Sequence, residues 1–254
     1  MILSELDLSL IVPAFLAGTL VLLTHVPLGN EVLKRGIIFI DLAIAQIAAL
    51  GVIAATIYGG DLSAWTVQLF AALSALAGAV FIHYLEQHYH KSLEALIGLL
   101  FVLAASGGLL LISQAAHADA LLHDLLVGQI LWVSAEQLYW IAGLNSLLLL
   151  IWFNFNTASP IIFYLVFSLA ITASVQLVGI YLVFASLILP ALASRAIQRP
   201  RYRLLFAYSI GLVGYTLGFI ASLVFDLPTG AVTVWTLLIS GYLFYRLFKS
   251  KPLR

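Results

Sequence analysis

Residues 160–194 read PIIFYLVFSLAITASVQLVGIYLVFASLILPALAS. The stretch contains no Asp, Glu, Lys or Arg, and it is much longer than the roughly 20 apolar residues that one helix needs to cross a bilayer. Gln176 and Gly179 offer the only plausible turn within it. It therefore predicts two transmembrane helices, 160–175 and 177–194.

The composition of the whole chain agrees with the prediction of transmembrane helices. Hydrophobic residues make up 63% and charged residues 9% of its 254 residues, whereas a soluble domain is nearer half apolar and a quarter charged. This composition excludes a water-soluble globule and a disordered tail. The net charge of zero argues against a nucleic-acid binder, and the absence of cysteine excludes a disulfide scaffold. The apolar runs are continuous, without the alternation of barrel strands, so the prediction is an all-α polytopic membrane protein.

The chain is predicted to be one transmembrane domain, residues 1–254, with about nine helices. Glu5 and Asp7 stand where a secretory signal would carry positive charge, so the first apolar run is interpreted as a retained helix. The predicted spans are 8–26, 37–58, 64–84, 94–113, 136–154, 160–175, 177–194, 204–224 and 230–247.

The distribution of charge supports this count. With nine spans, every Lys and Arg falls on one side of the membrane, in or beside segments 27–36, 85–93, 195–203 and the end after 247. The other side receives acidic residues alone, among them Asp61, Glu136 and Asp226. The positive-inside rule then predicts an outer N-terminus and a cytoplasmic C-terminus.

Common enzyme motifs are missing from the sequence. It contains no G-x-x-x-x-G-K-[ST], no H-E-x-x-H and no G-x-S-x-G. A carrier or channel subunit is therefore favoured over an enzyme, and ATP hydrolysis by a P-loop in this chain is excluded.

Asp41 is the one acidic residue placed inside a span rather than in a loop or at a helix end. A charge in hydrocarbon costs about 2.5–3.5 kcal/mol on the most lenient scale, and no Lys or Arg within the spans could pair with it. Asp41 either faces a wet cavity or binds a cation, or else it caps a helix near the interface. Gln46 lies about 140° further round the helix from Asp41. It either lines the same path, through a local break in the helix, or makes an interhelical hydrogen bond. An interhelical hydrogen bond is also expected for Asn145.

A predicted outer loop, residues 114–124, reads QAAHADALLHD and holds His117, Asp119, His123 and Asp124. If the loop is helical, Asp119 and His123 lie one turn apart. Imidazole and carboxylate groups suit zinc, manganese or iron. The loop is either a metal site or a solvated acidic loop.

A predicted cytoplasmic segment, residues 194–203, reads SRAIQRPRYR. Its four arginines follow from the positive-inside rule, and they could equally form a docking surface for a cytoplasmic partner. The candidate docking residues are Ser194, Arg195, Arg199, Arg201 and Arg203.

Over about residues 10–245, the chain resembles the integral membrane subunit of ABC-type importers for zinc, manganese and iron. Five segments in the right order support the resemblance: VLKRGIIFID (32–41), EALIGLLF (94–101), DLLVGQILWVS (124–134), VGIYLVFASLILPA (178–191) and DLPTGA (226–231).

The resemblance implies a multi-pass permease of the bacterial inner membrane that dimerises with a second copy of itself around a translocation path. The divalent metal ion is the transported substrate, and no cofactor is expected on this chain. The implied partners are a cytoplasmic ABC ATPase subunit, which hydrolyses ATP, and a periplasmic metal-binding protein; no nucleic acid is expected. Asp41 matches the family's pathway aspartate, and the ATPase contact is expected in the loop after Pro190.

One position departs from the family pattern, which places a histidine four residues after that aspartate. This chain has Ala45 there, followed by Gln46. Without the imidazole, the translocation path offers oxygen ligands, which favour manganese or iron over zinc. The competing hypothesis is a secondary, proton- or ion-coupled carrier using Asp41, for which a single acid and no evident inverted repeat give thin support.

Overall fold

The computed structural model describes residues 8–59, 62–113, 130–155 and 159–249 of the chain. Long helices fill these ranges, and no strand occurs in them. Eight of the helices there are long and apolar enough to cross a membrane by length and composition. The predicted all-α polytopic membrane fold is therefore confirmed.

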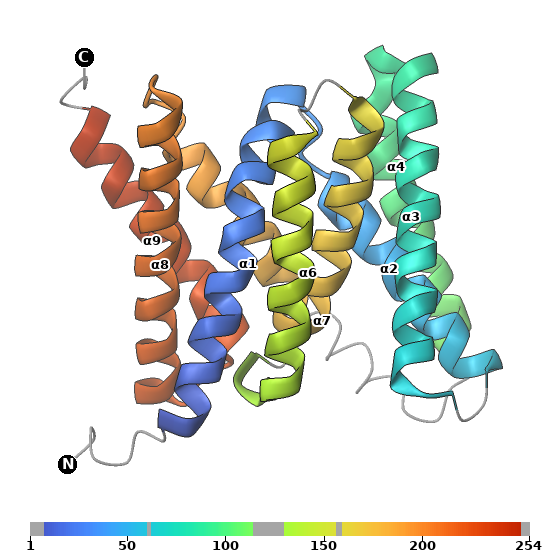
Figure 1. Ribbon diagram of the computed structural model, residues 1–254, viewed down its shortest axis with the longest axis horizontal. Helices are drawn as coiled ribbons and strands as arrows, with labels where there is room; N and C mark the ends of the chain where they lie inside the picture. Colours follow the sequence, from blue (N-terminus) through green and yellow to red (C-terminus); the bar gives the residue numbers. More distant parts are fainter. Residues whose placement is uncertain (1–7, 60–61, 114–129, 156–158, 250–254) are drawn as a thin grey trace. The chain divides into compact units, whose positions relative to one another are not determined.

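Figure 1 labels the helices in chain order. Their bounds are α1 Leu8–Arg35, α2 Ile40–Tyr58, α3 Ala64–His88, α4 Leu93–Ile112, α6 Ala135–Asn154, α7 Pro160–Ala193, α8 Pro200–Phe225 and α9 Thr229–Lys249, with single 3₁₀ turns at His90–Ser92 and Ile130–Trp132.

The chain forms two compact units. The first, called here the α8 unit, contains α1, α8 and α9 together with residues 130–146 and 176–199. The second, called the α2 unit, contains α2, α3 and α4 together with residues 147–155 and 159–175.

Helix α7 covers both predicted spans, 160–175 and 177–194, and non-helical backbone at Gly179 divides it into two helical segments. It is one element of 34 residues with a kink at Gly179, where φ is 79° and ψ is 162°. The predicted break is thus correctly placed, but a single residue makes it, so no loop separates the two segments. Glycine tolerates this backbone conformation because it has no Cβ. With α7 counted as one element, the described ranges hold eight long helices, and its two segments correspond to the two spans of the predicted nine.

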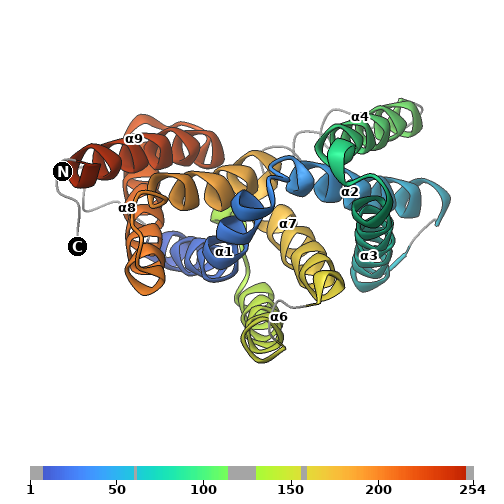
Figure 2. The same ribbon diagram turned by 90° about the horizontal axis from the view of Figure 1, so that it is seen from above.

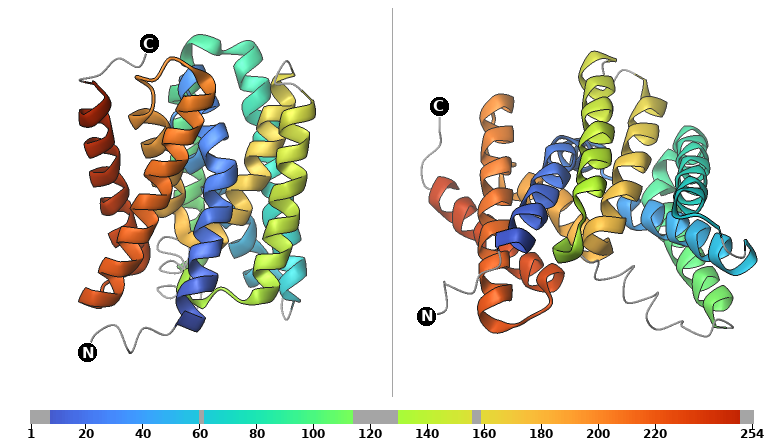
Figure 3. Two further views of the ribbon diagram at one scale, coloured as in Figure 1. Left: turned by 60° about the vertical axis from the view of Figure 1, so that its left-hand side comes forward. Right: turned by 60° about the horizontal axis from the view of Figure 1, so that its bottom comes forward.

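Small residues bring helices of the α8 unit close together. A Cβ on Gly214 would lie 2.9 Å from Cα of Leu237, and a Cβ on Gly218 would lie 2.7 Å from Cα of Thr233, both on α9. Thr236 on α9 also donates a hydrogen bond to the carbonyl of Gly214, at 2.7 Å. Helices α8 and α9 therefore pack backbone to backbone along this face, and Figure 3 shows them side by side.

In the α2 unit, α2 packs against both α3 and α4 (Figure 2). Alanines at helical spacing on α3, namely Ala71, Ala75 and Ala79, are fully buried, and Gly78 lies against Ile47 of α2. These small side chains allow α3 to approach α2 closely. The packing fixes the start of α2 beside the start of α4, where the candidate site lies.

Candidate functional site

Asp41 lies in the first turn of α2, two residues after the N-cap residue Phe39. Its relative exposure is 0%. Neither carboxylate oxygen has a hydrogen-bond partner among the residues that the structure describes. The partial positive charge of a helix N-terminus favours an anion there, but a buried carboxylate without hydrogen bonds is costly and calls for a ligand.

The turn before α2 places Asp41 at this position. Helix α1 ends at Arg35, and Gly36 takes a positive φ of 71°, which glycine adopts without strain. The chain re-enters helix through a bond from the N–H of Ile40 to the carbonyl of Ile37, at 3.3 Å. Asp41 is therefore held at a helix start rather than in mid-span.

Glu94 is a second carboxylate at this end of the α2 unit, and the sequence reasoning did not single it out. It lies in the first turn of α4, and its Oε1 accepts a hydrogen bond from the N–H of Phe39, at 3.2 Å. Its Oε2 is buried and has no hydrogen-bond partner in the described part of the chain. In the sequence, Glu94 opens the EALIGLLF segment of the family resemblance, but an acid at a helix start usually indicates only a favourable helix dipole.

Ala45 and Gln46 occupy different faces of α2. Ala45 lies one turn beyond Asp41 on the same face and is 1% exposed. Gln46 is half-buried. Helix α2 runs from Ile40 to Tyr58 without interruption, so the local break that would turn Gln46 toward Asp41 is not observed. The pathway role of Gln46 stays a prediction.

The predicted outer metal ligands, His117, Asp119, His123 and Asp124, lie outside the described residues. Within the described ranges, no group of three or more His, Cys, Asp or Glu side chains is arranged to hold a metal ion.

The predicted docking residues differ in their exposure. Arg195, Arg199 and Arg201 are exposed. Ser194 is 1% exposed, and its hydroxyl donates to the carbonyl of Ala191, at 3.2 Å. Arg203 is half-buried, and its Nε donates to the carbonyl of Ile197, at 3.0 Å. Three arginines are therefore available to a partner, while Ser194 and Arg203 hold the loop in shape.

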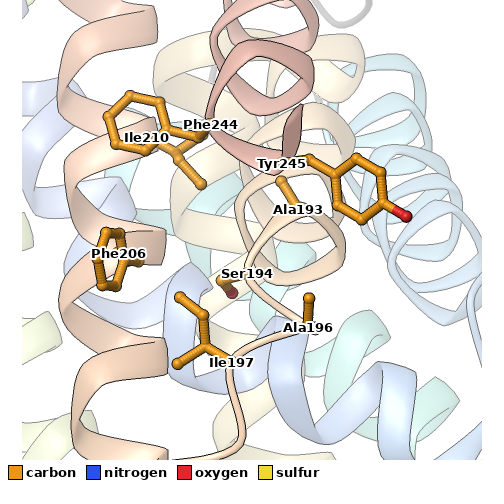
Figure 4. Close-up of a pocket in the computed structure, with 8 residues that line it drawn as sticks. All are labelled: Ala193, Ser194, Ala196, Ile197, Phe206, Ile210, Phe244 and Tyr245. Carbon is orange, nitrogen blue, oxygen red and sulfur yellow. The ribbon is translucent and has the colours of Figure 1, made fainter. Parts of the chain in front are cut away.

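A narrow pocket lies behind this loop (Figure 4). Ser194 and Ile197 face it from the loop, together with Phe206 and Ile210 of α8 and Phe244 of α9. A wider groove of about 560 Å³ lies between the end of α7 and α9, with Arg195 on its wall. The loop therefore rests on an apolar base, which positions its arginines.

Comparison with protein families gives a match over nearly the whole chain. The model of the ABC 3 transport family matches residues 7–159 and residues 154–249.

Two curated proteins are similar along most of their length. The manganese transport system membrane protein MntC of Halalkalibacterium halodurans is 27% identical over 246 residues, which cover 89% of this chain and 82% of that protein. An uncharacterized membrane protein of Synechocystis sp. is 28% identical over 242 residues, which cover 87% of this chain and 84% of that protein.

A solved structure shares the fold. A chain of PsaBC from Streptococcus pneumoniae, in complex with Fab, superposes with a TM-score of 0.76 at 21% identity and covers 96% of each chain.

Proposed function

Since the chain belongs to the ABC 3 transport family, and is thus a permease of the ABC metal-importer type, we propose that it forms the translocation path of an ATP-driven importer of divalent metal ions. The observation behind this proposal is Asp41, a fully buried carboxylate whose oxygens lack hydrogen-bond partners among the described residues. Ionisable residues within membrane helices are by default functional. A passing cation would supply the positive partner that the buried carboxylate lacks.

The donor atoms on this chain favour manganese or iron over zinc. Ala45 stands one turn from Asp41, where an imidazole would suit zinc. Carboxylate oxygens suit manganese better, and the similar protein of Halalkalibacterium halodurans is named for manganese transport. Conduction also needs a site that the ion can leave, so a sparse set of ligands is appropriate.

The mechanism needs partners for energy and for delivery of the ion. A cytoplasmic ABC ATPase would dock on exposed Arg195 and Arg199 of the loop between α7 and α8 and on exposed Arg201 in the first turn of α8. A periplasmic metal-binding protein would deliver the ion to the opposite face, and a second copy of the chain would complete the path. The complex would lie in the bacterial inner membrane, with the cycle of the ATPase driving alternating access.

Uptake of radioactive manganese tests the role of Asp41. Asp41→Asn removes the charge and keeps the size of the side chain, so uptake should fall about 10-fold or more, as expected when a metal site loses an essential group. Asp226→Asn is the matched control, because Asp226 is exposed and asparagine accepts its left-handed backbone. Normal uptake by correctly folded Asp41→Asn protein would remove Asp41 from the path.

Co-purification tests the coupling to ATP. Gentle extraction of the tagged chain from its native membrane should bring along a P-loop ATPase in fixed ratio, identified by mass spectrometry. Recovery of intact, folded chain without an ATPase in several detergents would instead favour the secondary carrier.

A further inference from the structure

We propose that Glu94 is the second carboxylate of the cation site at Asp41, so that the site holds a hard divalent cation such as Mn²⁺ between the N-terminal turns of α2 and α4. This inference rests on the proposed function and adds a ligand to it.

Glu94 is tied directly to the turn that places Asp41. The hydrogen bond from the N–H of Phe39 to Oε1 of Glu94 measures 3.2 Å, and Phe39 is the N-cap residue of the helix whose first turn contains Asp41. Helices α2 and α4 pack against each other within one compact unit. The Glu94 carboxylate therefore lies against the turn that carries Asp41.

Both carboxylates have oxygen atoms that are free to bind a cation. The two oxygens of Asp41 and Oε2 of Glu94 are buried without hydrogen-bond partners among the described residues. Two carboxylates with free oxygens beside each other in a membrane protein can share a cation between them.

Basic side chains of the α2 unit do not neutralise this pair in the described ranges. Lys91, His88 and His90 are exposed, and His83 contacts Gln87 and Glu86. No described ion pair reaches Asp41 or Glu94. The helix N-termini add partial positive charge, which helps to hold two carboxylates but does not balance them.

The two side chains differ in their access to water, and this difference indicates which of them lies nearer the solvent end of the cation site. Asp41 is fully buried, whereas Glu94 is half-buried. Glu94 would contact the ion nearer the solvent and Asp41 nearer the membrane, with water completing the coordination. Two oxygen ligands and water are typical of manganese or magnesium sites rather than of structural zinc sites.

Manganese binding to the full-length chain in detergent micelles tests the pair, with the electron paramagnetic resonance signal of free Mn²⁺ as the readout. Glu94→Gln keeps the oxygen that accepts from Phe39 and removes the charge, so the fold should persist while Mn²⁺ affinity falls about 10-fold or more. Glu136→Gln makes the same change on an exposed first-turn glutamate of α6 and should leave affinity unchanged. Thermal unfolding of each variant checks folding.

The outcomes separate this inference from the proposed function. If Glu94→Gln binds Mn²⁺ and supports uptake like the original chain while Asp41→Asn abolishes uptake, Glu94 is not a ligand and the transport proposal stands. If Glu94→Gln weakens binding and Glu94→Asp restores most of it, the second ligand is supported. If neither Asp41→Asn nor Glu94→Gln changes binding or uptake, both proposals fail.

Discussion

Some buried polar side chains in these helices form hydrogen bonds to a neighbouring helix. Nδ2 of Asn145 donates to the carbonyl of Leu20 at 2.8 Å, so the interhelical hydrogen bond predicted for Asn145 is confirmed. The hydroxyls of Ser186 and Tyr215 lie 2.9 Å apart and join α7 to α8. Asp41 has no such bond within the described residues. Because a polar group without a partner is costly in lipid, the bonds of Asn145 and Ser186 tie helices together, whereas the buried Asp41 carboxylate needs a ligand.

Replacing Asn145 should therefore affect stability rather than transport chemistry. Asn145→Ala removes the bond to α1, and interhelical hydrogen bonds of this kind are worth about 0.6 kcal/mol on average and up to about 1.7 kcal/mol. We expect a lower midpoint of thermal unfolding in detergent. Asn154→Ala is the control, since exposed Asn154 bonds only within its own helix; an equal shift in both variants would contradict the assignment.

Single residues decide how the helices begin, bend and pack. Pro27 has no N–H, so the carbonyl of Leu23 lacks its usual partner in α1. The hydroxyl of Tyr208 on α8 donates to that carbonyl at 3.0 Å. On α8, Gly214 and Gly218 admit the backbone of α9, as the G-x-x-x-G spacing predicts. At Gly179 of α7, the backbone adopts a conformation that other residues rarely take.

Gly179→Ala should destabilise the protein. An added Cβ is strained at φ 79° and ψ 162°, and residues forced into such regions cost about 1–3 kcal/mol. The expected result is a lower midpoint of thermal unfolding and a lower yield of folded protein. Gly143→Ala in α6 is the matched control: nothing lies within 4 Å of its added Cβ, and alanine is the better helix former by about 1 kcal/mol. Equal stability of Gly179→Ala and the original chain would show that the kink does not need glycine.

At the scale of the whole molecule, the number of membrane crossings depends on α7. A straight helix of its 34 residues would be about 51 Å long, well beyond a hydrocarbon core of roughly 30 Å. We therefore expect the segments before and after Gly179 to cross separately. The placement of all basic segments on one side requires the same nine crossings.

Single-cysteine labelling tests this topology directly, because the chain has no cysteine of its own. Phe155→Cys and Gln198→Cys, at exposed positions before and after α7, should react with a membrane-impermeant maleimide from the same, cytoplasmic side. Ser63→Cys, exposed before α3, should react from the outside. Labelling of positions 155 and 198 from opposite sides would mean that α7 crosses once.

The class of fold and the first residue of the candidate site follow from patterns along the sequence alone. A bilayer allows only helices or closed barrels, so continuous apolar runs are sufficient to predict where helices lie. The cost of a charge in hydrocarbon, together with the lack of a basic partner in the spans, was likewise enough to single out Asp41. The position of the break in α7 also followed from composition, at the one glycine of that stretch.

Which side chains meet depends on the packing of helices that are far apart in the sequence. Glu94 is 55 positions away from Phe39 in the chain, and no local pattern predicts that α4 begins beside the N-terminus of α2. The same holds for Ser194, which sequence reasoning grouped with the docking arginines and which packing buries. Contacts of this kind depend on how small residues let particular helices approach, and that choice is made by packing in three dimensions rather than by the order of residues along one helix.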